Sequence, residues 1–378
     1  MDFDLTDDQK LLTDSVSKLL ADRYSFEARK GFQKQQEGWS TEVWAQFAEL
    51  GLLGLPFDEA YGGFGGGAVD VMLVMEQFGK ALVLEPYLAT VVLAGTALKI
   101  AGSDAQKAAL LPEIVAGSLK MAFAHSEQGA RYDLDDVTTT AKQADGGWVI
   151  DGAKSVVLHG DCADKIVVST RTSGDRNDRA GITLFLVDGK SKGVGTRAYT
   201  LRDGTRAAEL SFASVQVAAD AMLGKLGGGF AVVQRVVEAG ISAMAAETVG
   251  GMDRMLDITL DYLKTRKQFG KPIGENQVLQ HKAADMLMSL EQGRSMSMLA
   301  AMMVDEVDEA ERDRNIAMAK VGVGQAGRFV SQNAVQLHGG IGMTEEYMIG
   351  HYFRRVMMFE HSFGDTAYYL NKLADQVH

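Results

Sequence analysis

The sequence predicts an α+β protein in which a helical region, a strand-rich region and a second helical region follow one another. Apolar residues recur at helical spacing up to about residue 118, short β-branched runs follow, and long amphipathic patterns return from residue 226. A chain of 378 residues also exceeds one ordinary core. Because helices and strands are segregated, we expect separate domains at 1–118, 119–225 and 226–378 rather than a βαβ sheet.

Each region has its own local signals. In the first region, Val16, Leu19 and Leu20 repeat at helical spacing, and the apolar stretch 69–78 predicts a helix after a glycine-rich loop. In the second, residues 165–170 and 182–187 are β-rich runs bounded by Gly and Asp. In the third, residues 230–265 and 278–307 predict two long helices.

Composition restricts the class of function. The net charge of −12 argues against a nucleic-acid partner, because phosphate binding needs a basic surface. Cys162 is the only cysteine, so no intrachain disulfide can form and a reducing compartment, the cytoplasm, is expected. The acidic N-terminus argues against a signal peptide, and no uninterrupted apolar run reaches membrane length. No histidine has metal-ligand spacing, so we expect no metal site.

One motif is misleading. Residues 322–327 match the dinucleotide fingerprint Gly-x-Gly-x-x-Gly, which requires a strand before it and a helix after it. The preceding residues continue a helical pattern instead. We therefore interpret these glycines as the small residues of a close helix contact.

Two other stretches point to an anionic cofactor. The first is Arg266-Lys267-Gln268-Phe269-Gly270-Lys271, with Gln277 beyond it, and the second is Gln336-Leu337-His338-Gly339-Gly340. A guanidinium offers a planar fork of donors to a diphosphate, and glycines let backbone N–H groups approach a ligand closely. The alternative is helix punctuation, an arginine on a solvated face and a glycine C-cap. The presence of both stretches favours the cofactor.

The same stretches resemble the acyl-CoA dehydrogenase family, and the resemblance covers essentially the whole chain. It includes the segment 123–130, Phe-Ala-His-Ser-Glu-Gln-Gly-Ala, which is similar to that family's flavin-contacting segment, and the strand-like stretches 149–154 and 210–217. The resemblance implies an N-terminal helical domain, a central β-barrel-like domain and a C-terminal four-helix bundle. It also implies an FAD-dependent α,β-dehydrogenation of an acyl-CoA thioester, with electron-transfer flavoprotein as the electron acceptor.

Site residues follow from the resemblance position by position. Those expected to bind FAD, some of them across a subunit contact, are Phe123, Ser126, Arg266, Phe269, Gln277, Gln336, Gly339, Gly340 and Thr366. Those expected to bind the substrate are Tyr132, Gln234 and Arg235. The cofactor half-sites imply a homo-oligomer, or a hetero-oligomer with a homologous large subunit, and a tetramer in either case.

The chain departs from the family around the reacting centre. Gly364 occupies the position of the usual glutamate base, and Val233 or Gln234 occupies the family's second position for it. Where the family usually has Trp-x-Thr against the flavin, this chain has Val156 and Leu158. Asp365 is the replacement base that we assign, with Glu360 as the other carboxylate within a small loop shift.

These departures leave three hypotheses. The chain is an FAD-dependent acyl-CoA dehydrogenase, the small subunit of a hetero-oligomer with an altered site. Alternatively, it is a catalytically silent partner that completes a homologue's FAD site. The third is a flavin monooxygenase-like member of the same fold, which is weakened because no oxygenation motif is identifiable.

Overall fold

The computed structural model describes residues 5–376 and confirms the α+β class. The chain forms two compact units. The first, which we call the helical unit, combines Met1–Gly31, Ala68–Val83 and Ile241–His378, and the second, the sheet unit, combines Phe32–Gly67 and Leu84–Gly240. Helix α7 (Gly229–Thr265) contributes residues to both.

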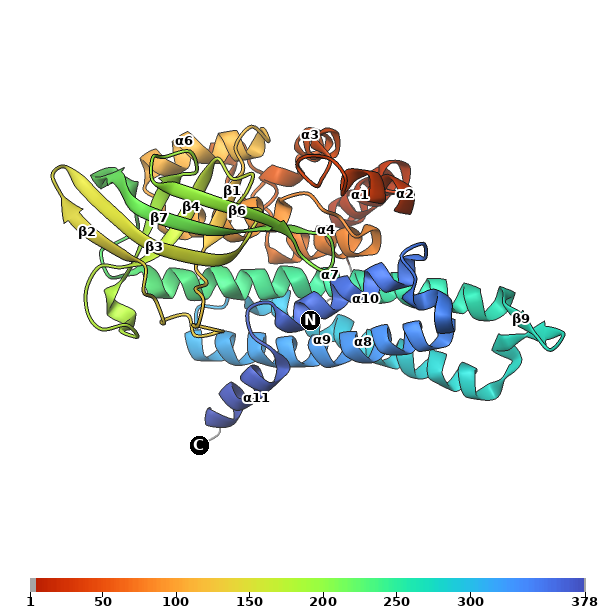
Figure 1. Cartoon of the computed structure of the whole chain (residues 1–378). Coiled ribbons are helices and arrows are strands. Elements are labelled where there is room, and N and C mark those ends of the chain that lie inside the picture. Colours follow the sequence, from red (N-terminus) through yellow and green to blue (C-terminus); the bar gives the residue numbers. More distant parts are fainter. Residues whose placement is uncertain (1–4, 377–378) are drawn as a thin grey trace. The chain divides into compact units, whose positions relative to one another are not determined.

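The sheet unit is built on eight strands, the yellow and green arrows of Figure 1. Their order is β6-β7-β3-β2-β4-β5-β8, and β1 pairs in parallel with β4. The strands are β1 (Met121–Ala124), β2 (Thr140–Ala144), β3 (Gly147–Leu158), β4 (Lys165–Arg171), β5 (Ile182–Asp188), β6 (Val194–Thr200), β7 (Arg206–Ala218) and β8 (Met222–Leu223). The two predicted strands are β4 and β5, an antiparallel pair in which Lys165 faces Asp188.

Helices flank these strands in the same unit. They are α3 (Thr41–Glu49), a π-helix (Leu88–Ala94), α5 (Gly95–Ala101) and α6 (Asp104–Val115). The π-helix holds β1 in place, because the Thr90 hydroxyl donates to the Met121 carbonyl at 3.0 Å and accepts from its N–H at 3.1 Å. β1 leads directly into the segment predicted to contact flavin.

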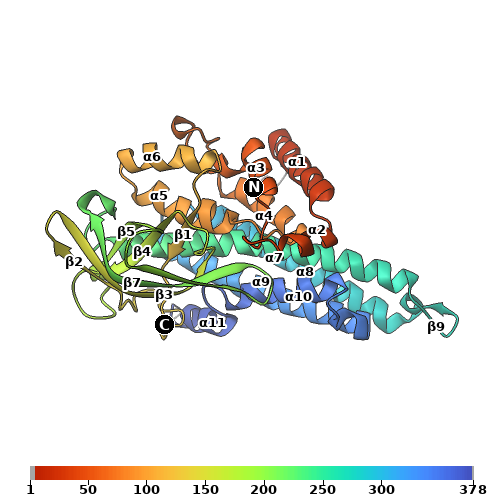
Figure 2. The same cartoon turned by 45° about the horizontal axis from the view of Figure 1, so that its top comes forward.

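The helical unit contains the long C-terminal helices. Its other helices are α1 (Asp7–Arg23), α2 (Phe26–Phe32), α4 (Ala68–Ala81), α8 (Gln277–Met303), α9 (Glu309–His338), α10 (Met348–His361) and α11 (Thr366–Asp375). Helices α8, α9 and α10 lie side by side in Figures 1 and 2. Their shared core includes Met286, Val330 and Ile349. The predicted helix 278–307 ends earlier than expected, because Asp308 caps the start of α9.

Helices α4 and α7 touch backbone to backbone. A Cβ atom added to Gly79 would lie 1.9 Å from the Glu247 carbonyl oxygen, and one added to Gly250 would lie 1.9 Å from the Glu76 carbonyl oxygen. Real Cβ contacts are never so short. Glycine is therefore required at both positions, and the two helices can meet in only one register.

The helices bear on two interpretations of the sequence. Gly322, Gly324 and Gly327 lie inside α9, with helix before and after them, so the dinucleotide fingerprint is absent as a structure. Among residues 5–376, α7 is the one helix long and apolar enough to cross a membrane, and 67% of its most apolar stretch is buried inside the protein. Such burial is expected of a core helix.

Candidate functional site

The predicted flavin segment begins on β1 of the sheet unit. Phe123 is buried in this strand, and its ring stacks on that of His125 with centroids 5.2 Å apart. Ser126 follows, and its backbone carbonyl accepts a hydrogen bond from the Ser155 N–H at 2.9 Å. The segment is thereby fixed against β3. Tyr132 is half-buried in the loop that continues from it.

A buried ion pair anchors this segment. Glu127 and Lys154 are 2.7 Å apart, and the Lys154 side chain is fully buried. Burial alone would raise the pKa of Glu127, but Lys154, Thr138 and Thr139 outweigh burial and lower the pKa to about 2. Lys154 also donates to the Ser169 hydroxyl at 2.9 Å. The pair therefore joins the segment to β3 and β4.

Position 156, where the resemblance expects a tryptophan, is structurally unusual. Val156 adopts a φ of +53°, which β-branched residues rarely do, and its side chain is 49% exposed. Strand β3 changes register against β7 between Lys154 and Val157, so Val156 sits on a bulge. A cleft of 510 Å³ opens beside it, lined among others by Gln128, Ser155, Arg197 and Glu209.

The two predicted substrate residues on α7 share one partner. Gln234 donates to the Glu238 carboxylate at 3.2 Å, and Arg235 lies 3.9 Å from its other oxygen. Glu238 is only 3% exposed. Glu238 was not among the predicted site residues, although its spacing of four residues from Gln234 places both on one helix face. The helix that carries the family's second base position thus has a buried carboxylate one turn further on.

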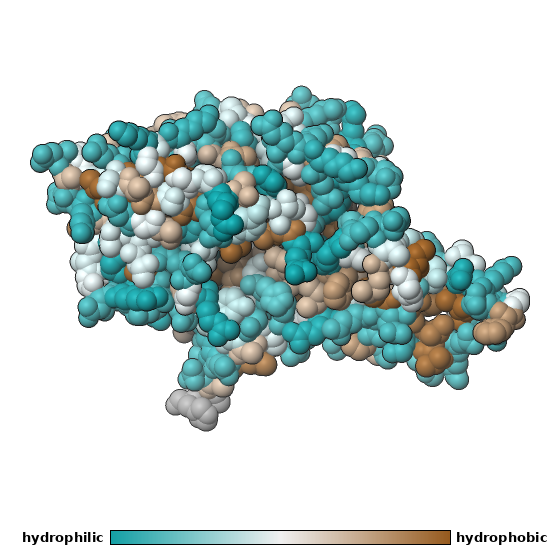
Figure 3. Space-filling model, in the orientation of Figure 1, coloured by the Kyte–Doolittle hydropathy of each residue, from teal (hydrophilic) through white to brown (hydrophobic). Residues whose placement is uncertain are grey.

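The predicted diphosphate residues gather at one end of the helical unit. Arg266 follows α7 directly, and its N–H donates to the Tyr262 carbonyl at 2.8 Å. Beyond it, β9 (Lys267–Gln268) and β10 (Lys271–Pro272) form a hairpin whose tip, Phe269, is fully exposed. Gln277 opens α8 and is also exposed. Figure 3 shows hydrophobic surface near the position of β9 in Figure 1.

The second stretch ends at the same place. The His338 ring stacks on Tyr262, with centroids 4.5 Å apart, and Tyr262 is one helical turn before Arg266. Gln336, Gly339 and Gly340 are exposed around it. We call Arg266, Gln277, Gln336, Gly339 and Gly340 the bundle-end residues.

The bundle-end residues fit an anionic cofactor. No heavy atom lies within 4 Å of where a Cβ would stand on Gly339 or Gly340, so a ligand can approach the backbone there. The buried His338 Nε2 has no hydrogen-bond partner among residues 5–376. Arg266, Lys267 and Lys271 are all exposed beside this end. The accessible backbone at Gly339 and Gly340, the unpaired His338 nitrogen and the three exposed cationic side chains together suit a nucleotide diphosphate.

Position 364, where the resemblance expects the family's base, leaves no room for a side chain. Gly364 has a φ of +117°, and a Cβ there would lie 2.5 Å from Tyr369 Cε2 and 2.9 Å from Tyr368 Cδ1. The preceding Phe363 also has a positive φ, +60°. The Tyr369 ring cannot simply rotate away, since its hydroxyl donates to the Phe363 carbonyl at 2.8 Å.

Both replacement carboxylates have structural partners. Asp365 caps α11 and accepts from the Tyr368 N–H at 2.8 Å. Glu360 is 4% exposed and accepts from Arg328 at 2.8 Å. It also accepts from the Thr366 hydroxyl at 2.9 Å, so the hydroxyl predicted to contact flavin is directed to Glu360. Lys320, nearly fully buried on α9, donates to the Phe359 carbonyl next to Glu360.

Comparisons with known proteins agree with this architecture. Family models of the acyl-CoA dehydrogenase N-terminal, middle and C-terminal domains match residues 6–118, 122–216 and 227–378. A short-chain specific acyl-CoA dehydrogenase of Megasphaera elsdenii is 32% identical over 367 residues, 94% of each chain. The chain therefore belongs to the acyl-CoA dehydrogenase family.

Two further similarities bear on cofactor and partner. The caffeyl-CoA reductase-Etf complex subunit CarC of Acetobacterium woodii is 29% identical over 323 residues, 84% of each chain. The solved FAD complex of PigA superposes with a TM-score of 0.90 at 25% identity, covering 100% of this chain and 99% of the other.

Proposed function

We propose that this chain is an FAD-binding subunit whose bundle-end residues hold the adenosine-diphosphate half of FAD in a neighbouring subunit. The guanidinium of Arg266 forms charge-assisted bonds to the diphosphate, Gln277 and Gln336 donate amide N–H groups, and the open backbone at Gly339 and Gly340 receives the nucleotide. Phe123 and Ser126 face the flavin ring from the sheet unit, with Tyr132 beside the substrate. The exposed apolar tip at Phe269 packs in the subunit contact.

The assembly carries out α,β-dehydrogenation of an acyl-CoA thioester. FAD, when bound, accepts the hydrogen that leaves the β-carbon as hydride. The protein must supply a carboxylate that removes the α-proton within hydrogen-bond reach in a dry pocket. Electron-transfer flavoprotein then accepts the electrons, a role supported by the similarity to a subunit of an Etf complex.

This chain acts as the smaller subunit of a hetero-tetramer, similar to the small subunit of pimeloyl-CoA dehydrogenase, and its own pocket is silent. One observation carries this proposal: the backbone and the two tyrosine rings at Gly364 leave no room for a base, whereas the bundle-end residues are all present and exposed. The domains 1–118, 119–225 and 226–378 and a cytoplasmic location remain part of the proposal.

A second candidate is dehydrogenation in this chain's own pocket. The observation that favours it is Glu238, a buried carboxylate held by Gln234 and Arg235, two of the three predicted substrate residues. Asp365 is the other base to consider, although its carboxylate already caps α11.

Co-purification with a glutamate-bearing homologue separates the two candidates. We expect negligible bleaching of flavin by acyl-CoA in this chain alone, and activity with the partner that is unchanged by Asp365→Asn or Glu238→Gln. Rapid bleaching of the homo-oligomer, lost in either variant while FAD stays bound, identifies that residue as the base and overturns the silent-subunit proposal.

Cofactor retention tests the bundle end independently of activity. Arg266→Ala removes charge-assisted bonds and is expected to weaken FAD binding roughly ten- to a hundred-fold. Arg314→Ala is the matched control, because Arg314 is an exposed arginine on α9 away from the bundle-end residues. Absorbance of FAD per subunit after dialysis gives the result, and equal retention by both variants means that Arg266 does not contact the cofactor.

A further inference from the structure

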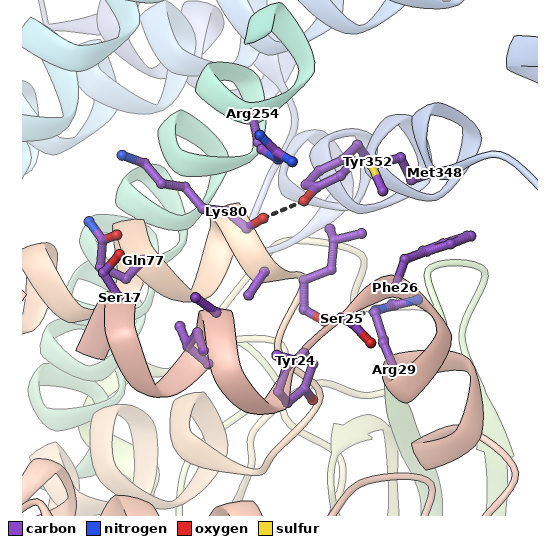
Figure 4. A pocket seen from close by; sticks show the side chains of 14 residues that line it. Ser17, Tyr24, Ser25, Phe26, Arg29, Gln77, Lys80, Arg254, Met348 and Tyr352 are labelled. Atoms are coloured by element: carbon purple, nitrogen blue, oxygen red, sulfur yellow. Dashed lines mark hydrogen bonds between the residues drawn. The ribbon is translucent and has the colours of Figure 1, made fainter. Parts of the chain in front are cut away.

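One exposed residue of β3 is held in a strained conformation. Among residues 5–376, Val156 is the only β-branched residue with a left-handed φ, and its side chain is 49% exposed. Leu82 shows how packing can offset such strain: it has a φ of +57°, lines the cavity of the helical unit drawn in Figure 4 and is only 2% exposed. Val156 has no comparable burial, so packing within the sheet unit does not explain its conformation. Strain of this kind is concentrated at binding and catalytic sites.

A single glutamate of β7 faces the strained segment. The register of β3 against β7 shifts there, so that two residues, Ser155 and Val156, face the single residue Glu209. This is the arrangement of a β-bulge, in which the extra residue loses its place in the ladder of backbone hydrogen bonds. The Val156 N–H donates instead to the Glu209 carboxylate at 3.3 Å. The side chain of Glu209 therefore replaces a backbone bond that the bulge removes.

Neighbouring groups hold this carboxylate in place. The Tyr199 hydroxyl donates to Glu209 at 2.7 Å. Burial alone would raise the pKa of Glu209, but its hydrogen bonds outweigh burial and lower the pKa. Arg197 lies directly opposite Glu209 on β6 and acts in the same direction, and its guanidinium stands over the Tyr199 ring, 5.8 Å from the centroid. Glu209 is therefore an ionised acceptor that is fixed from both neighbouring strands.

The bulge lies beside the predicted flavin segment. The carbonyl of Ser126 in that segment accepts from the N–H of Ser155, the residue before Val156. Ser155 and Glu209 also line the cleft of 510 Å³ together with Gln128 of the same segment. We propose that Glu209 is a positioning residue, which holds the β3 bulge so that the exposed side chain of Val156 packs against the flavin ring. This inference rests on the proposed function, because it requires the flavin ring to lie at Ser126.

The affinity and the absorbance of FAD in the full chain test this role. Glu209→Val removes the acceptor with a side chain that favours strands, whereas Glu209→Gln keeps a side-chain oxygen for the Val156 N–H. We expect Glu209→Val to weaken FAD binding roughly three- to tenfold, because the exposed half of one valine side chain loses its apolar contact. Glu209→Gln should stay within about twofold of wild type. With saturating FAD, the flavin absorbance maximum should move in Glu209→Val and not in Glu209→Gln.

A control and a second variant separate this role from a general loss of structure. Glu59→Ala replaces an exposed glutamate of the same unit outside the cleft, and should change neither affinity nor absorbance. Val156→Gly removes the contact itself, and it should fold even if Glu209→Val does not, because glycine adopts a left-handed φ without strain. It should weaken FAD and move the absorbance maximum as Glu209→Val does.

The outcomes distinguish this inference from the proposed function. Wild-type affinity and absorbance in either Glu209→Val or Val156→Gly overturns the inference, as does an equal loss in Glu209→Gln. If Arg266→Ala loses FAD in the same experiment, the proposed function still stands. If Arg266→Ala retains FAD like wild type, the proposed function fails and this inference fails with it.

Discussion

Placing a glutamate at position 364, where the resemblance expects the family's base, should fail for a structural reason. A side chain at Gly364 must adopt a φ of +117° and place its Cβ 2.5 Å from Tyr369 Cε2. Backbone strain of this kind costs about 1–3 kcal/mol. Over-packing against a ring that is held by its own hydrogen bond costs about 1–3 kcal/mol more. Gly364→Ala should therefore destabilise the protein by about 2–6 kcal/mol.

Urea unfolding followed by circular dichroism measures this cost. Gly31→Ala is the control, because Gly31 lies within α2, has no atom within 4 Å of a Cβ and has no left-handed φ. That substitution should be neutral or stabilising by up to about 1 kcal/mol. Gly364→Glu should show the same loss as Gly364→Ala without gaining flavin bleaching. A Gly364→Ala protein within about 0.5 kcal/mol of wild type, a surface-like value, would refute the reasoning.

Four further predictions concern buried residues. Glu127→Gln leaves the buried Lys154 ammonium uncompensated and should cost about 3–5 kcal/mol of unfolding free energy, so a loss below about 1 kcal/mol would contradict the pairing. Because the pKa of Glu127 falls from 4.5 to about 2 on folding, its contribution should be complete above pH 4.5 and disappear as the pH falls toward 2. Burial lowers the pKa of Lys320 from 10.5 to about 7, so between these pH values the unfolded chain binds one more proton than the folded chain, and stability should rise with pH. The difference in urea midpoint between the wild-type protein and Lys320→Met should therefore increase over this pH range. A difference that does not change with pH would contradict the prediction. Gly79→Ala and Gly250→Ala should each lower the melting temperature sharply while Gly31→Ala does not, and a melting temperature equal to that of wild type would mean that α4 and α7 can separate without loss.

Helices and strands that depend on the local spacing of apolar residues could be predicted from the sequence. The helix predicted over 230–265 and the strands predicted over 165–170 and 182–187 follow from local sequence pattern, and the structure confirms them as Gly229–Thr265, Lys165–Arg171 and Ile182–Asp188. The bundle-end residues were predicted because donors and glycines sit at helix ends, and their role in binding a cofactor stays a prediction. Glu238 was missed, since its burial depends on packing that a single sequence does not display. The obstruction at Gly364 was equally hidden, because it arises from two rings further along the chain.

The contact between α4 and α7 fixes the position of each helix along the other. On each helix the glycine lies three residues after the carbonyl that meets its partner, so the two contacts form a reciprocal pair. Sliding either helix by one residue would place a side chain between the two backbones, where it would clash. Apolar side chains packed between two helices would not oppose such a shift as strongly. Ion pairs among Lys80, Glu76, Asp253 and Arg294 lie beside this helix contact. Amide hydrogens around Gly79 and Gly250 should accordingly exchange among the slowest in the protein. Helices without such a close contact should exchange their amide hydrogens faster.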